Sequence, residues 1–475
     1  MIHSCRLIWL ITLICYYASS DAATRNETFT PTNSSSSRPK FEVSSKLRAK
    51  LFNRTSSSFE KCFTNDVHEL NDHLSVGQQE NSRTLIHGLY RFSINMLKSL
   101  HNFESRDTST GILVSPFSIW SALVVSYMGA RGDTDRELRV VLGLDDVPKY
   151  AVGMAYQGLR FWYKLKKNAT GASKKFAYSV ANKIFVNKQL QLDSCIDEHF
   201  GVEVEAMDFV GDPYGSTQKI NAWVEQTTNN KIKDLIPNGA ITPWTNIIIA
   251  NAIYFHSKWL NQFDPAKNEI RSFHVSPTED IPVQMMIQTG TFMFGVSENL
   301  RSTILDIPYA NQDFSMLIIL PETSKGVDSL VRNLSPQDLD TVINNLYDDE
   351  VYLALPRFKF EQEFELAGPL YSMGIKKLFD PRFSDLSGFF ASVKKSNDSN
   401  FPAIGITVNS IVHKSFISVN EEGTEAAAAT ALLIARSGRP AFPTQFVVDR
   451  PFVYLIRDTA TNVILFMGIV RRPQE

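Results

Sequence analysis

The chain has 475 residues, of which 43% are apolar, so it can bury a large core. Its formal net charge is −2. This balance gives no global electrostatic reason to bind nucleic acid or an anionic membrane. We therefore expect a globular protein with neither of these partners.

Residues 1–22 have the organisation of a secretory signal peptide. Arg6 precedes the apolar run "LIWLITLICYYA", and the small residues Ser20 and Ala22 follow it around Asp21. A membrane anchor is the alternative, but the run is short and polar sequence follows it at once. We expect cleavage after this segment, which makes the protein secreted and extracellular.

Residues 23–80 are rich in Ser, Thr and Asn, which predicts a disordered, glycosylated N-terminal extension. Sequons of the form Asn-x-Ser/Thr occur here and further along the chain, and each is a candidate acceptor for a glycan in a secreted protein. The candidates are Asn26, Asn33, Asn53, Asn168, Asn333 and Asn397.

Two of the four cysteines, Cys5 and Cys15, fall within the signal peptide. The mature chain keeps Cys62 and Cys195. In an oxidising compartment this pair can form a disulfide that ties the extension to the body, or both can remain free thiols. The sequence leaves these alternatives open because it does not supply the geometry that a disulfide needs.

Periodic sequence begins near residue 81 and continues to the end of the chain. Residues 82–100 repeat apolar side chains at helical spacing, and the nearly all-apolar segment 115–134 predicts a helix in the centre of the core. The pattern over 216–236 also predicts a helix. Short apolar or alternating runs predict strands: 179–187, 246–255, 302–309, 314–321, 351–360 and 406–420. We expect one mixed α+β domain over residues 81–475, with antiparallel sheets.

The tripeptide Arg131-Gly132-Asp133 matches an integrin-binding motif. A structural interpretation is also available, because Gly132 permits a turn and Asp133 or Thr134 can cap the following helix through its side-chain oxygen. A bare tripeptide is a weak match, so we favour the structural interpretation.

No motif for catalysis is present. The sequence lacks a zinc-binding H-E-x-x-H, a G-x-S-x-G nucleophile elbow and a phosphate-binding loop, so we expect no enzyme, no metal and no cofactor. One basic cluster could bind a sulfated polysaccharide, although a solvated helix end and loop is the commoner origin of such a run. Its members are Lys164, Lys166, Lys167, Lys174 and Lys175.

The segment "EEGTEAAAATALLIARSGRP" at 421–440 combines conflicting signals. Four consecutive alanines, Ala426 to Ala429, favour a helix, yet the segment follows a strand-like run and ends in a basic tail with Gly and Pro.

This segment is one of several motifs, all in the expected order, by which residues 82–473 resemble the serpins. The motifs are VSPFSIWSAL, VANKIFV, NAIYFHSKW, LDIPY, MLIILP, LPRFKFE, NEEGTEAAAAT and FVVDRPFVYLIRDTATNVILFMGIVRRP. The resemblance implies an α+β fold of three β-sheets and about nine helices, with 421–440 as an exposed reactive loop.

The resemblance also implies a mechanism. A serine protease cleaves the loop and forms an acyl-enzyme through its nucleophilic serine. Before water releases the protease, the cleaved loop inserts into the main sheet as a new strand and the protease active site is distorted. The resemblance makes 421–430 the hinge of this movement: Glu421, Glu422, Gly423, Thr424, Glu425, Ala426, Ala427, Ala428, Ala429 and Thr430.

The residues of the loop fit an inserting strand. Side chains alternate between faces with a period of two, so Thr424, Ala426 and Ala428 share one face, while the charged Glu425 lies on the other. A charge on the first face would stall insertion, because burying an unpaired charge costs several kcal/mol. Gly423 can bend without the restriction that a Cβ imposes.

The bond that a protease would cut is Arg436–Ser437 or Ser437–Gly438. The commonest family spacing, 17 residues counted from Glu421, gives the second bond, and a spacing one residue shorter gives the first. An arginine fits the acidic specificity pocket of trypsin-like proteases. We therefore predict cleavage at Arg436–Ser437.

The family resemblance assigns a polar "shutter", where the main sheet parts, to Ser115, Ser118, Asn251 and His413, and a "breach", where the loop first enters, to Trp259. The alternative for each is an ordinary buried group with its hydrogen bonds satisfied. The predicted protein is thus a secreted, monomeric suicide inhibitor that forms a covalent complex with a trypsin-like serine protease. A similarity to arthropod haemolymph serpins suggests an immune protease cascade. The alternative is a non-inhibitory serpin that acts as a carrier, storage protein or chaperone.

Overall fold

A computed structural model describes residues 62, 77–103, 110–145, 147–169, 176–310, 312–391, 405–424 and 442–474. The chain divides into two compact units, one made of residues 1–85 and 144–169 and the other of residues 86–143 and 170–475. Among the described residues, no helix combines the length and apolar composition needed to cross a membrane.

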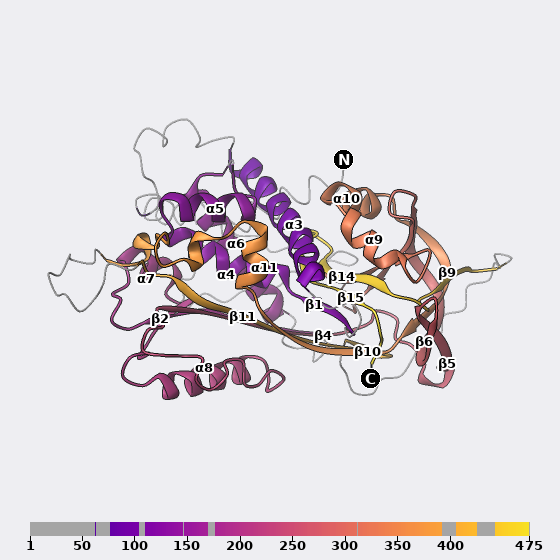
Figure 1. The fold of residues 1–475 in the computed structure, drawn as a ribbon. Helices are drawn as coiled ribbons and strands as arrows, with labels where there is room; N and C mark the ends of the chain where they lie inside the picture. The colour runs from indigo at the N-terminus through magenta and orange to yellow at the C-terminus, as the bar shows by residue number, and fades with distance from the viewer. Residues whose placement is uncertain are drawn as a thin grey trace. The chain divides into compact units, whose positions relative to one another are not determined.

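Nine α-helices lie in the described part of the chain (Figure 1). They are α3 (Gly77–Phe103), α4 (Pro116–Gly129), α5 (Gly132–Leu142), α6 (Lys149–Ala169), α7 (Ser194–Phe200), α8 (Pro213–Thr227), α9 (Gly326–Asn333), α10 (Pro336–Asn344) and α11 (Ala367–Met373). The smaller unit contains α6, whose buried residues Val152, Tyr156, Leu159 and Tyr163 follow the spacing of one helical face.

The larger unit contains a nine-stranded and a six-stranded sheet. In the first, the strand order is β1 (Gly111–Val114), β15 (Ile464–Val470), β14 (Phe452–Asp458), β8 (Phe314–Pro321), β7 (Ser302–Pro308), β6 (Glu279–Ser297), β9 (Tyr347–Pro356) and β13 (Thr444–Val447), with β5 (Glu269–Ser276) also paired to β6. The long strand β6 hydrogen-bonds with β7 and with β9, so two of the three expected sheets form one continuous sheet.

The six-stranded sheet has the order β10 (Phe358–Glu365), β11 (Val408–Asn420), β12 (Gly423–Thr424), β4 (Ile247–Lys258), β2 (Phe176–Asn187) and β3 (Val204–Met207). Every run predicted to be a strand lies in one of these two sheets. Helix α8 covers one face of the six-stranded sheet, where Ile220 and Val224 join a cluster that includes Phe185 and Phe416 (Figure 1).

Helix α4 lies between the two sheets, in contact with β2 and β4 of one and β15 of the other. All 14 of its residues are buried, which confirms the central helix predicted from its apolar composition. Pro116 occupies its first turn, and the Ser115 hydroxyl caps it by accepting from the backbone N–H of Ser118 at 3.3 Å.

The helix predicted over 216–236 is shorter than expected, because α8 ends at Thr227. Asn229 and Asn230 follow with φ angles of 54° and 59°. Asparagine tolerates this left-handed conformation better than most residues, and two such residues in succession end the helix. The apolar periodicity continues beyond it because Ile232, Leu235 and Ile236 still pack in the core.

Candidate functional site

The candidate site is the end of the six-stranded sheet where β11 turns back into β12. Strand β11 pairs directly with β4 in parallel from Val408↔Ile247 to Phe416↔Tyr254. Beyond that point β12 lies between them, with Thr424 opposite Val419 of β11 and Ser257 of β4. The two middle strands are therefore already parted at this end, and the first two residues of a further strand occupy the gap.

Gly423 occupies this gap because no larger residue fits there. Its φ angle is 152°, a conformation that residues with a side chain rarely adopt. A Cβ atom at this position would lie 2.1 Å from the carbonyl oxygen of Ser257 and 2.6 Å from the Cα of Lys258. The glycine thus allows the backbone of β12 to approach β4 closely enough to pair with it.

Thr424 is fully buried beneath this end of the sheet. Its hydroxyl lies 2.9 Å from the hydroxyl of Tyr309, and either can donate the hydrogen bond. The Tyr309 ring stacks on Trp259, with centroids 4.6 Å apart and an interplanar angle of 8°. Trp259 is also buried. The stacked pair of Trp259 and Tyr309 therefore lies next to Thr424, the first side chain inserted into the sheet.

The turn between β11 and β12 is held from the β4 side. The Trp259 indole N–H donates to the carbonyl of Asn420 at 2.9 Å. The backbone N–H of Trp259 donates to the carbonyl of Glu422 at 2.8 Å, and that of Phe263 donates to the carbonyl of Glu421 at 2.9 Å. These bonds satisfy the carbonyls of a tight turn and fix the direction in which the chain enters the sheet.

A charged pair anchors the side chain of Glu421, which is only 5% exposed. Arg357 donates to the Glu421 carboxylate from Nε at 2.6 Å and lies 2.5 Å from it through a terminal nitrogen. Asn268 donates to the same carboxylate oxygen. The buried negative charge is therefore paired and hydrogen-bonded, as a buried carboxylate requires.

The four predicted shutter residues meet beneath the middle of the same sheet. The backbone N–H of Ser115 donates to Nε2 of His413 at 3.2 Å, and the Ser115 hydroxyl donates to the carbonyl of Leu465 at 2.6 Å. Nδ1 of His413 lies 2.6 Å from Oδ1 of Asn251, to which the Ser118 hydroxyl also donates at 2.9 Å. This network joins α4, β4 and β11 below the point where the strands part.

Burial lowers the pKa of His413 to about 3, so its imidazole is neutral at physiological pH. Since the Ser115 N–H donates to Nε2, the proton of the neutral ring is on Nδ1, which donates to Asn251. A charged imidazole would lose this arrangement, because Nε2 would then also carry a proton and could not accept.

Residues that the sequence did not single out complete the site. Asn182 of β2 donates to the Ser118 carbonyl at 2.9 Å and so joins the hydrogen-bond network of Ser115, Ser118, Asn251 and His413. Tyr309 contacts Thr424 and Arg357 contacts Glu421 at the end of the sheet where Trp259 lies. Asn182, Tyr309 and Arg357 lie within the motifs VANKIFV, LDIPY and LPRFKFE, so a signal was present, but the motifs alone do not say which side chains converge.

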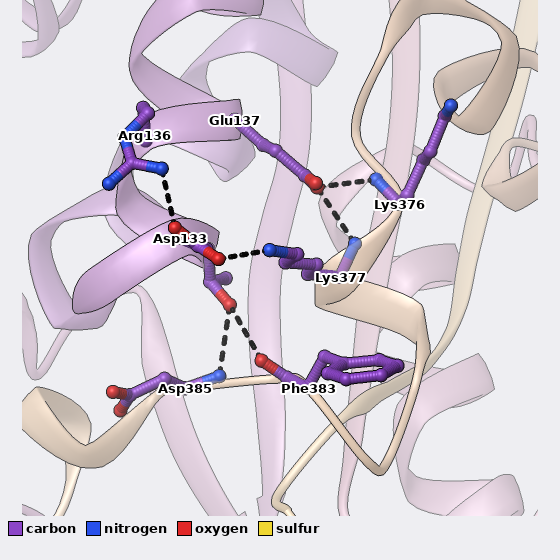
Figure 2. Close-up of polar contacts among 8 residues, drawn as sticks. Asp133, Arg136, Glu137, Lys376, Lys377, Phe383 and Asp385 are labelled. Atoms are coloured by element: carbon purple, nitrogen blue, oxygen red, sulfur yellow. Dashed lines mark hydrogen bonds and ion pairs between the residues drawn. The ribbon is translucent and has the colours of Figure 1, made fainter.

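The tripeptide Arg131-Gly132-Asp133 is occupied by structural contacts. The Arg131 guanidinium donates to the carbonyls of Ala130 at 2.8 Å and Met128 at 3.3 Å. Figure 2 shows Asp133 bound by Arg136 and Lys377. Both charged side chains of the motif are therefore engaged within the chain.

The predicted cap by Asp133 or Thr134 is wrong. Helix α5 begins at Gly132, so both residues lie inside its first turn, and Arg131 is the N-cap without a side-chain hydrogen bond. The Thr134 hydroxyl instead accepts from the backbone N–H of Asp385 at 2.9 Å. The tertiary contact with the 380–389 segment replaces the local cap.

Both Cys62 and Cys195 are disulfide-bonded, and their pairing with each other stays a prediction. Asn333 is exposed at the end of α9, as a glycan acceptor must be. Asn26, Asn33, Asn53 and Asn397 lie outside the described residues, as do hinge residues 425–430 and the bonds around Ser437. The same is true of Lys174, Lys175 and the side chains of Lys164, Lys166, Lys167 and Asn168.

The fold and the site define a class of protein in which the segment following β11 enters the six-stranded sheet between β11 and β4. A family model described as "Serpin (serine protease inhibitor)" matches residues 87–473. The chain therefore belongs to the serpin family, which is a family of protease inhibitors and not of enzymes.

Individual relatives agree with this assignment. The chain is 34% identical over 390 residues to Iris of Ixodes ricinus, covering 82% of this chain and 99% of that protein. It is 37% identical over 381 residues to serine protease inhibitor 42Dd of Drosophila melanogaster, covering 79% and 95%. The solved structure of Serpin48 of Tenebrio molitor matches with a TM-score of 0.66 and 28% identity, covering 82% and 99%.

Human thyroxine-binding globulin, solved in complex with thyroxine, also matches. Its TM-score is 0.69 at 26% identity, and the match covers 83% of this chain and all of the globulin. The fold is thus shared with a protein whose name describes binding of a small molecule, so the fold alone does not decide between the two functions considered above.

Proposed function

We propose that the protein is a secreted suicide inhibitor of a trypsin-like serine endopeptidase. The observation that carries this proposal is the position of Gly423 and Thr424 between β11 and β4. An inserting loop must begin its new strand in this slot. In this chain the first residue has the required glycine conformation and the second is a small side chain that is completely buried.

In the proposed reaction the protease serine attacks the carbonyl carbon of Arg436. The Arg436–Ser437 peptide bond breaks, the new amino group of Ser437 takes a proton, and Arg436 becomes an acyl ester of the protease. Residues after Thr424 then continue β12 between β11 and β4, which must separate along the stretch where they now pair directly. At about 3.3 Å per residue, the 13 residues from Thr424 to Arg436 would carry the protease roughly 40 Å along the sheet.

Incubation with trypsin tests this proposal. We expect a complex that survives a denaturing gel, together with a released C-terminal peptide that begins at Ser437. Arg436→Ala should abolish the complex with trypsin, whereas Arg439→Ala, which removes the neighbouring arginine of the loop, should preserve it. Cleavage of the unaltered protein without a stable complex would instead favour a non-inhibitory serpin, and a peptide beginning at Gly438 would move the reactive bond by one residue.

A further inference from the structure

The hydrogen bond between Tyr309 and Thr424 joins two hydroxyl groups in a fully enclosed position. Both residues have no measurable exposure to solvent. Among the described residues, each of these hydroxyls has the other as its hydrogen-bond partner, with 2.9 Å between the oxygens. A buried hydroxyl that loses its partner carries a penalty in free energy, so each side chain makes the seated position of the other more favourable.

Tyr309 is held in place independently of Thr424. Its ring stacks on Trp259 and meets Phe255 edge-on, with centroids 5.1 Å apart and an interplanar angle of 66°. Its backbone N–H donates to the carbonyl of Phe314 at 3.0 Å, and it forms an isolated β-bridge with Trp259. The hydroxyl therefore points to a defined place in the sheet before any hinge residue arrives there.

We propose that Tyr309 is a positioning residue for loop insertion. Its hydroxyl holds Thr424 between β11 and β4 before a protease arrives, and we call this arrangement the seated state. The inference rests on the proposed inhibitory function. When Thr424 leaves the sheet, its own hydroxyl can bond to water, but the buried Tyr309 hydroxyl loses its partner. The seated state is favoured for this reason, and insertion after cleavage starts from residues that are already paired with β4 and β11.

The fraction of molecules in the seated state affects how the acyl-enzyme divides between trapping and release of the protease. The acyl-enzyme is consumed by two competing steps: insertion of the loop, which traps the protease, and hydrolysis, which releases it. When the seated state is less populated, Gly423 and Thr424 must first pair with β4 and β11. The rate of loop insertion therefore falls, while the rate of hydrolysis is unchanged. The number of inhibitor molecules consumed per trapped protease should then rise.

The test uses the full-length secreted protein and five variants: four single substitutions and the double variant Tyr309→Phe/Thr424→Val. Tyr309→Phe removes one hydroxyl and Thr424→Val removes the other, while Thr424→Ser keeps a hydroxyl in the same place. Tyr454→Phe is the matched control, since Tyr454 is also fully buried and no hydrogen bond to its hydroxyl is found within the described chain. The first measurement is hydrogen exchange of the peptide covering residues 408–424 in uncleaved protein. The second is the stoichiometry of trypsin inhibition.

We expect Tyr309→Phe and Thr424→Val each to raise exchange at the hinge and to raise the stoichiometry by roughly three- to ten-fold, as the loss of one buried hydrogen bond implies. Thr424→Ser and Tyr454→Phe should behave like the unaltered protein. The double variant should be closer to the unaltered protein than the product of the single effects, because neither hydroxyl is then left unpaired.

Unchanged hinge exchange in Tyr309→Phe would overturn the inference, as would an equal effect in Tyr454→Phe, which would indicate a general loss of packing. If the unaltered protein forms no complex with trypsin, the proposed inhibitory function fails. Hinge exchange in the uncleaved protein then decides by itself whether Tyr309 seats Thr424.

Discussion

If the proposed inhibitory function is correct, replacing Gly423 with alanine should convert the protein from an inhibitor into a substrate. The added Cβ would lie 2.1 Å from the Ser257 carbonyl oxygen and 2.6 Å from the Lys258 Cα, both of which are backbone atoms of β4. Backbone in the middle of a sheet cannot retreat without breaking its own pairing. The φ of 152° adds conformational strain of about 1–3 kcal/mol for a residue with a side chain.

Strain of this size alone shifts the ratio of seated to displaced hinge by about 5- to 150-fold, since 1.4 kcal/mol corresponds to a factor of ten. The clash with β4 adds to it, so β12 should be displaced from the sheet in Gly423→Ala. We therefore expect trypsin to cleave the variant without being trapped. A denaturing gel should show the cleaved chain in place of the complex, and the molar excess needed for full inhibition should rise at least five-fold.

Gly239→Ala is the matched control for this experiment. Gly239 also has a positive φ, of 85°, but apart from its own atoms and its two chain neighbours no atom lies within 4 Å of the place its Cβ would occupy. The control therefore introduces comparable backbone strain without a clash and far from the hinge in the sequence. If Gly423→Ala traps trypsin with the same stoichiometry as the unaltered protein, or if Gly239→Ala loses inhibition to the same degree, the close approach of Gly423 to β4 does not control insertion.

Three further predictions concern stability. The folded-state pKa of His413 is about 3, below the ordinary 6.5, so the unfolded chain binds the proton first and stability falls as the pH drops below 6.5. Denaturant unfolding should show that lowering the pH from 7.5 to 5.5 costs the unaltered protein about 1.4 kcal/mol more than it costs His413→Gln. Arg357→Ala should lower the free energy of unfolding by about 2 kcal/mol, because it leaves the buried Glu421 carboxylate without its cation. Thr134→Val should cost about 1 kcal/mol in thermal unfolding, because the partly buried backbone N–H of Asp385 loses its acceptor.

Conservative variants serve as controls for these predictions. Arg357→Lys keeps a cation near Glu421 and should recover part of the loss, and Thr134→Ser keeps the hydroxyl and should recover most of it. An identical pH dependence in the unaltered protein and His413→Gln would show that His413 is not the group that titrates. A stability of Arg357→Ala equal to that of the unaltered protein would show that Asn268 and solvent suffice to satisfy Glu421.

Much of the fold could be predicted from short-range patterns. The nearly all-apolar segment 115–134 predicted the central helix, and six short runs predicted strands β2, β4, β7, β8, β9, β10 and β11. Burial of one face leaves a periodic pattern in the sequence, and burial of all faces leaves a continuous apolar run. The end of α8 could not be placed in this way. Ile232 and Leu235 continue the apolar pattern after the backbone has left the helix at Thr227, so periodicity reports burial and not backbone conformation.

The same distinction applies to the site. The motif residues Ser115, Ser118, Asn251 and His413 share one hydrogen-bond network, while their role as a shutter stays a prediction. Tyr309 was not expected to contact Thr424, although it lies in a quoted motif, because 115 residues separate the two in the chain. Only the folded sheet brings them within hydrogen-bonding distance.

The sequence by itself determined the composition of the hinge: a glycine, a small hydroxyl residue and a run of alanines, which together suit a strand that must pass from solvent into a sheet. The tertiary structure decided where that strand begins. Strands β11 and β4 are parted at one end, and Gly423 and Thr424 are already seated in the gap over Trp259 and Tyr309. Side-chain size is a local property that can be read from the sequence, whereas the gap is formed by segments far apart in the chain and exists only when the sheet is assembled.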